Sequence, residues 1–137
     1  MSGELQEAVQ RLIPQLGIHK IPPASNELMT LVRSESSTLL IARYPDKEGK
    51  IFGMLTLAIY RVPTGVRSIV EDVVVDEKMR RRGIAEALLR RAIDLAREAG
   101  ANGVSLTSNP QREPANLLYQ VMGFKRRETN TYFYAIK

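Results

Sequence analysis

The chain has 137 residues, a length typical of one folded domain, and we predict that residues 1–137 form a single domain. Apolar residues make up 44% and charged residues 26%, the balance of a globular rather than a disordered protein. The absence of cysteine excludes disulfides, zinc–thiolate sites and thiol nucleophiles. There is no signal segment and no apolar run near the roughly 20 residues that span a bilayer, so we expect a cytoplasmic protein without membrane contact.

The net charge of +5 is concentrated in two basic clusters, Arg80–Arg82 and Lys125–Arg127. A basic protein invites a nucleic-acid interpretation, but neither cluster belongs to a nucleic-acid-binding motif. We interpret the second cluster as solvated surface. The first cluster suits a small polyanion such as a nucleotide phosphate, because arginine forms charge-assisted hydrogen bonds with phosphate oxygens.

The first half of the chain alternates helical and extended patterns. Apolar residues recur at helical spacing over Glu4–Leu16, and Glu27–Arg33 predicts a second short helix. Leu39–Tyr44 and Ile51–Tyr60 are predicted strands that form an antiparallel hairpin, and Ser68–Val75 is the next strand.

In the second half, a wide apolar face predicts a long helix over Gly83–Ala99. A short strand at Val104–Thr107 and a helix at Pro114–Met122 follow. Phe124–Lys125 and Thr131–Ile136 are predicted terminal strands. Antiparallel strands followed by a strand–helix–strand–helix unit indicate a three-layer α+β domain, with a mixed, mostly antiparallel sheet flanked by helices.

The stretch from Val70 to Ala85 carries the chemical signal, because a Val-rich strand runs through a basic loop into a long helix. The first turn of a helix has free backbone N–H groups and the positive end of the helix dipole. Gly83 permits close approach of a ligand to the backbone, and the small Ala85 keeps the path open. This arrangement predicts a cradle for a pyrophosphate group.

The cradle lacks the usual nucleotide-loop motifs. It contains no Gly-Lys-Ser/Thr, so magnesium-assisted phosphoryl transfer has no support, and no dinucleotide-type Gly-x-Gly-x-x-Gly. We predict no metal site. A cradle without phosphoryl-transfer residues indicates that the diphosphate is a handle and that the reaction takes place elsewhere on the same ligand.

Two linked motifs resemble one family. Arg80-x-x-Gly83-x-Ala85 after a Val-rich strand is similar to the acetyl-coenzyme A signature of the Gcn5-related N-acetyltransferase (GNAT) family. Downstream, Asn109-Pro110 follows a strand, and the block from Ala115 through Tyr119 to Gly123-Phe124 resembles the family's helix that ends Tyr-x-x-x-Gly-Phe. The resemblance covers roughly residues 37–137.

The resemblance implies acetyl-coenzyme A as the donor cosubstrate, with no metal. Backbone groups of the third strand would bind the acetyl and pantetheine amides, backbone N–H groups of the loop would hold the pyrophosphate with Arg80 beside it, and two asparagines would line the other side. The strand residues are Val73, Val74 and Val75, and the loop residues are Arg81, Arg82, Gly83, Ile84 and Ala85. The two asparagines are Asn109 and Asn116. The strand around Ser105–Ser108 would splay from Val73–Val75 in a V shape, leaving a slot for the pantetheine.

The resemblance also assigns catalytic roles. In the family a neutral amine attacks the thioester directly, and Tyr119 matches the tyrosine that protonates the leaving thiolate. Glu71 and Asp72 are candidate bases, acting directly or through a water. Strand alternation predicts that their side chains point to opposite faces, so that only one points into the slot. We favour Glu71 because the family often bulges this strand.

In one respect the chain departs from the family, whose members usually begin with a strand before the first helix. The chain begins with the predicted helix Glu4–Leu16, so the sheet is expected without that first strand, and the acceptor pocket cannot be derived. The expected acceptor is a primary amine on a small molecule or peptide. A charged tRNA or a protein lysine is an alternative that suits the basic surface, and a non-catalytic acetyl-coenzyme A sensor or interaction module is another. A homodimer is compatible with the family, whose members often pair.

Overall fold

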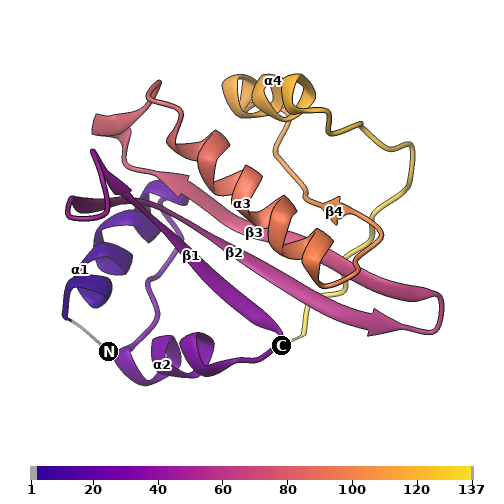
Figure 1. The fold of residues 1–137 in the computed structure, drawn as a ribbon, viewed down its shortest axis with the longest axis horizontal. Coiled ribbons are helices and arrows are strands. Elements are labelled where there is room, and N and C mark those ends of the chain that lie inside the picture. Colours follow the sequence, from indigo (N-terminus) through magenta and orange to yellow (C-terminus); the bar gives the residue numbers. More distant parts are fainter. Residues whose placement is uncertain (1–2, 137) are drawn as a thin grey trace. The chain divides into compact units, whose positions relative to one another are not determined.

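The computed structural model describes residues 3–136 of the chain. The chain divides into two compact units, Met1–Thr107 and Ser108–Lys137, and each is described by itself. The first unit contains a four-stranded sheet with helices on both faces, and the second contains one helix (Figure 1). No helix among residues 3–136 has the length and apolar character needed to cross a bilayer.

The first unit begins with helices, and no strand precedes them in the described residues. Helix α1 spans Gly3–Leu12 and continues as a 3₁₀ turn, η1, over Ile13–Leu16. The predicted single helix over Glu4–Leu16 therefore changes character at Pro14, which has no N–H to donate to the preceding turn. Helix α2 spans Ser25–Arg33.

The sheet has the order β1-β2-β3-β4, as predicted for a mixed, mostly antiparallel sheet. The strands β1 (Ser37–Tyr44), β2 (Lys50–Val62) and β3 (Gly65–Val75) form antiparallel neighbours. Strand β4 (Val104–Ser105) is shorter than predicted and pairs in parallel with β3. Because no described strand precedes α1, β1 forms one edge of the sheet.

The two faces of the sheet carry different helices. On one face lies α3 (Ile84–Glu98), so close that a Cβ atom added to Gly53 would come within 3.0 Å of Ile84 and 3.2 Å of Leu88. The neighbouring Met54 points to the opposite face, where it joins a buried apolar cluster with α1 and α2. This cluster contains Ala8, Val9, Leu12, Leu28, Ile51, Met54 and Val74.

The second unit contains helix α4 (Glu113–Met122), which ends at Gly123 in a left-handed conformation. The predicted strands Phe124–Lys125 and Thr131–Ile136 were wrong, since residues 124–136 form neither helix nor strand. A strand requires a hydrogen-bonding neighbour, and the described sheet ends at β4. The local pattern of aromatic residues favours extended backbone but supplies no such neighbour.

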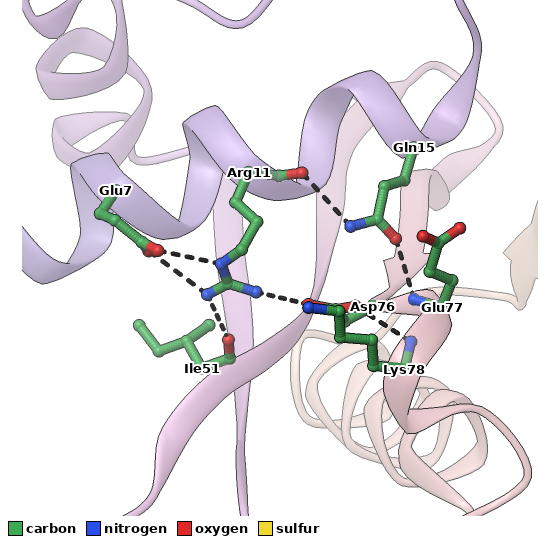
Figure 2. A network of polar contacts seen from close by, with 7 residues as sticks. All are labelled: Glu7, Arg11, Gln15, Ile51, Asp76, Glu77 and Lys78. Carbon is green, nitrogen blue, oxygen red and sulfur yellow. Dashed lines mark hydrogen bonds and ion pairs between the residues drawn. The ribbon is translucent and has the colours of Figure 1, made fainter.

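A salt-bridge network fastens α1 to the end of β3 (Figure 2). Arg11 Nη1 donates a 2.8 Å hydrogen bond to Oδ2 of Asp76, which is only 4% exposed. Burial by itself raises the pKa of Asp76, but hydrogen bonds from the Lys78 amide and the Arg11 guanidinium outweigh it, so the pKa lies below its ordinary value of 3.8. A carboxylate of lowered pKa stabilises the fold above its unfolded pKa and loses that contribution as pH falls through its folded pKa.

We expect Asp76→Asn to lower the free energy of unfolding by about 1 to 2 kcal/mol at pH 7, because the charge-assisted bond to Arg11 is lost. The difference between wild type and variant should shrink as the pH falls from the unfolded pKa of aspartate, about 3.9, through the lower folded pKa of Asp76. Urea unfolding at several pH values measures both quantities. A difference that stays constant down to pH 2 would show that the charge of Asp76 does not stabilise the fold.

Candidate functional site

One edge of β3 has no strand partner over most of its length. Strand β4 pairs only with Ser68 and Ile69, while β3 continues to Val75. Beyond Ile69, the backbone groups on that edge face no other strand within residues 3–107. The predicted divergence of β3 from β4 begins after Ile69. Val73, Val74 and Val75 lie along the unpaired part of this edge.

A β-bulge interrupts β3 next to the two candidate bases. Thr56 lies opposite Glu71 and Met54 opposite Val74, so β3 has one extra residue between these pairs. Asp72 takes a positive φ of 52° there. The bulge therefore breaks the alternation that was used to place Glu71 and Asp72 on opposite faces. Because Thr56 and Met54 share a face, Glu71 lies on the face of Val74, which α1 covers. Both carboxylates are exposed.

The loop after β3 contains a short 3₁₀ helix followed by left-handed backbone. Asp76 caps the short 3₁₀ helix η2 (Glu77–Met79) by accepting a hydrogen bond from Lys78 N. After η2 the chain turns sharply, with Arg81 at φ 65° and Gly83 at φ 77°. A left-handed conformation is uncommon for arginine, and residues held in this way concentrate at functional sites.

The loop leads into the open N-terminus of α3. Gly83 occupies the N-cap position and no side chain caps the helix, so the first-turn amides, including those of Ile84 and Ala85, have no intrahelical acceptor. Arg80 and Arg81 are exposed and form no ion pair or hydrogen bond with any described residue. The Arg82 guanidinium lies 5.6 Å from the centroid of the Tyr44 ring, a cation–π contact. The predicted cradle residues thus form one continuous basic turn that ends at the uncapped amides of α3.

Tyr119 is the buried side chain of α4, 8% exposed, and its ring packs edge-on against Phe124 at 6.0 Å between centroids. Burial raises the pKa of Tyr119 above 10, and the positive charge of Arg112 opposes this only in part. The phenol therefore keeps its proton at neutral pH, as a general acid requires.

Asn109 and Asn116 lie together in the second unit. Asn116 Nδ2 donates to the carbonyls of Asn109 (2.9 Å) and Arg112 (2.8 Å), and Asn109 Oδ1 accepts from Gln111 N. These bonds hold the turn before α4, so both side chains have a local structural role. Among residues 3–136, no three His, Asp or Glu side chains gather where they could hold a metal ion.

The sequence did not single out Arg11, Gln15 or Asp76. Arg11 binds Asp76, and Gln15 binds the Glu77 amide at the start of η2. Arg11 and Asp76 are 65 positions apart, so no local spacing connects them. The one local signal was an aspartate directly after the Val run, where a side chain can cap the following turn.

One family model and one curated human protein match this chain. The Acetyltransferase (GNAT) family matches residues 7–124. The human protein N-acetyltransferase 8 is 36% identical over 83 residues, which cover 59% of this chain and 37% of that protein. The chain therefore spans little more than a third of the length of this curated relative.

Solved structures share the fold over nearly the whole chain. A transcriptional regulator from Bacillus halodurans C-125 gives a TM-score of 0.81 at 25% identity, covering 98% of this chain and 95% of its own. An aminoglycoside acetyltransferase from an uncultured soil metagenomic sample gives 0.82 at 20% identity, covering 97% and 89%. A Trypanosoma brucei acetyltransferase gives 0.77 at 23% identity, covering 97% and 94%. The last two likenesses show the fold alone.

The left-handed backbone at Gly83 can be tested against a matched glycine at the other end of α3. Gly83 and Gly100 have φ of 77° and 80°, and an added Cβ would meet nothing within 4 Å at either. We expect Gly83→Ala and Gly100→Ala each to lower the free energy of unfolding by about 1 kcal/mol, because only the backbone strain differs from wild type. Urea unfolding measures this. If only Gly100→Ala lowers the free energy of unfolding, the loop at Gly83 relaxes to negative φ in the alanine variant.

Proposed function

The chain belongs to the GNAT acetyltransferase family, and from that membership we propose that it transfers an acetyl group from acetyl-coenzyme A to a primary amine. The observation that carries the proposal is the turn between β3 and α3. There Arg81 and Gly83 adopt left-handed backbone directly before an uncapped helix N-terminus, at the end of a strand edge without a partner.

The donor would lie along this stretch. Its pyrophosphate suits the amides from Arg81 to Ala85, of which those in the first turn of α3 have no intrahelical acceptor, since such groups and the helix dipole both favour negative charge. The unpaired guanidinium groups of Arg80 and Arg81 add charge-assisted hydrogen bonds. The pantetheine arm carries amide groups, which can pair with the free backbone edge at Val73–Val75 as a strand would.

The reaction we propose takes place in a ternary complex of enzyme, donor and acceptor. The amine nitrogen loses a proton to Glu71 or Asp72, directly or through a water, and attacks the thioester carbon. The new C–N bond forms as the C–S bond breaks, and the departing thiolate takes a proton from Tyr119. The acylated nitrogen then gives up its second proton, which restores the phenol of Tyr119 directly or through a water. A phenol can supply this proton because it is protonated at neutral pH, and burial, which raises the pKa of Tyr119, keeps it protonated until the basic thiolate departs.

Two exposed carboxylates near the end of the strand edge favour a cationic acceptor, which a protonated amine is at neutral pH. We propose a small-molecule or peptide amine, and the name of the human relative, an N-acetyltransferase, supports transfer to nitrogen. A charged tRNA is a polyanionic acceptor and would instead give an apparent Michaelis constant that rises steeply with ionic strength. A cytoplasmic location and a homodimer remain expectations.

Calorimetric titration with acetyl-coenzyme A tests the donor site. We expect one site in the wild type and roughly a hundredfold weaker binding in Gly83→Glu, because a carboxylate would face the pyrophosphate. Gly100→Glu is the matched control, with similar backbone strain at the far end of α3, and should bind like wild type. Absence of binding to the wild type would contradict the enzyme proposal and leave a partner-binding module.

Turnover tests Tyr119. We expect Tyr119→Phe to lower kcat by about a hundredfold or more, as is typical for loss of a general acid, while affinity for acetyl-coenzyme A changes little. Tyr134→Phe in the same unit is the control, since its side chain is 87% exposed and has no proposed role. Unchanged turnover in Tyr119→Phe would remove it as the acid, and equal losses in both variants would indicate a general effect on the second unit.

A further inference from the structure

We propose that Arg11 is a positioning residue for the donor site: through Asp76 it holds the turn before the cradle in the conformation that presents the amides of Arg81–Ala85. This inference rests on the proposed function, because it concerns the same pyrophosphate cradle. It assigns α1, which lies far from the cradle in sequence, a role in coenzyme affinity beyond its part in the apolar core.

Arg11 uses both sides of its planar guanidinium (Figure 2). Toward its own helix, Nε donates to Glu7 at 2.9 Å, an i,i+4 pair with the acidic residue N-terminal. Toward the sheet, Nη2 donates to the carbonyl oxygen of Ile51 at 2.8 Å and Nη1 to Asp76 Oδ2 at 2.8 Å. The guanidinium also lies 5.9 Å from the centroid of the Phe52 ring. Arg11 therefore joins α1, the start of β2 and the end of β3.

Asp76 links Arg11 to the turn before the cradle. Its Oδ2 accepts from Arg11, and its Oδ1 accepts from Lys78 N at 3.1 Å, the bond that caps η2. Its backbone is fixed as well, because its N–H donates to Phe52 O at 2.7 Å and its carbonyl accepts from Met79 N at 2.8 Å. With one oxygen held by Arg11, the carboxylate keeps the orientation that caps the turn.

A second residue of the same N-terminal segment reaches the turn directly. Gln15 in η1 accepts a 2.9 Å hydrogen bond from Glu77 N through Oε1, and its Nε2 donates to the Arg11 carbonyl at 3.4 Å (Figure 2). The first two amides of η2, those of Glu77 and Lys78, are thus held by Gln15 and by the carboxylate that Arg11 orients. The N-terminal segment fixes the chain immediately before the cradle.

The cradle needs such a constraint because its backbone is strained. Arginine at φ 65° is unfavourable by about 1 to 2 kcal/mol relative to ordinary helical backbone. Residues in this conformation persist only where the surrounding structure over-determines them. Arg80 and Arg81 have no side-chain contacts with described residues that could hold the loop. The loop is therefore held by its two ends, η2 and α3, and by the contact of Arg82 with the Tyr44 ring.

The chain supplies a matched control in a second ion pair of α1. Glu4 and Arg43 form two hydrogen bonds of 2.8 Å that tie the start of α1 to β1. The Arg43 side chain is 30% exposed and that of Arg11 22% exposed, so the two arginines are similarly buried. Arg43 has no contact with Asp76 or η2. Arg43→Gln therefore weakens the attachment of α1 without loosening the cradle.

The experiment measures the dissociation constant of coenzyme A by calorimetry and the unfolding midpoint in urea for wild type, Arg11→Gln and Arg43→Gln. We expect both variants to lose stability, and Arg11→Gln alone to bind coenzyme A about tenfold more weakly. Steady-state kinetics should show the same split, with a raised KM for acetyl-coenzyme A, an unchanged KM for the acceptor and kcat within about twofold of wild type.

Asp76→Asn and the double variant with Arg11→Gln complete a thermodynamic cycle. If Arg11 acts through Asp76, the double variant should bind coenzyme A about as weakly as either single variant, because both changes break the same link. If the losses of affinity of the two single variants multiply in the double variant, Arg11 does not act through Asp76. Arg11→Lys keeps the charge opposite Asp76 but not the planar fork, and should recover part of the affinity. It also serves as the test variant if Arg11→Gln does not fold.

The outcomes separate this inference from the proposed function. Failure of the wild type to bind coenzyme A would overturn the proposed function. Binding by the wild type with equal affinity in Arg11→Gln would overturn the positioning role while leaving the donor site intact. Equal loss of affinity in Arg11→Gln and Arg43→Gln would also overturn it, since it would show a general effect of loosening α1.

Discussion

A strand edge that is unpaired within residues 3–107 and a helix N-terminus without a side-chain cap meet at one turn of this chain. The turn is short, so the backbone has to reverse through left-handed conformations at Arg81 and Gly83. Glycine takes this conformation without strain, whereas arginine does not. The unfavourable backbone of Arg81 is offset by fixed structure at both ends, namely η2 with its Asp76 cap and the first turn of α3.

Helices on both faces of the sheet support this turn. The face of Gly53 receives α3 at close range, which sets where the amides of its first turn lie. The other face carries α1, whose apolar residues form the core with Met54 and Val74. Arg11 of α1 holds Asp76, and Gln15 of η1 reaches the start of η2. The bulge at Asp72 lies in the ladder between β2 and β3, directly before Val73–Val75. The donor cradle, the candidate bases and the core are therefore parts of a single strand–turn–helix unit.

Much of this arrangement could be predicted from the sequence, because it depends on local patterns. The Val-rich strand, the basic loop and the amphipathic helix each have a recognisable periodicity or composition, and Gly83 stands where the structure needs positive φ. The bulge was expected from the family, but its effect on Glu71 depends on the pairing of β2 with β3, which alternation alone does not give. The link between Arg11 and Asp76 joins residues distant in sequence, and no spacing rule could identify it. The strand prediction for Thr131–Ile136 failed because β propensity describes the chain locally, whereas a strand requires a partner.

The most direct test of the donor site is to observe the amide groups that it uses. The backbone ¹⁵N–¹H resonances of the protein would be followed by NMR as acetyl-coenzyme A is added to saturation. The account predicts the largest shifts, and slower hydrogen exchange, for the amides of Arg81 through Ala85, with smaller shifts along Val73–Val75. Shifts confined to other parts of the chain, or none at saturating acetyl-coenzyme A, would contradict the assignment of the turn between β3 and α3 as the pyrophosphate cradle.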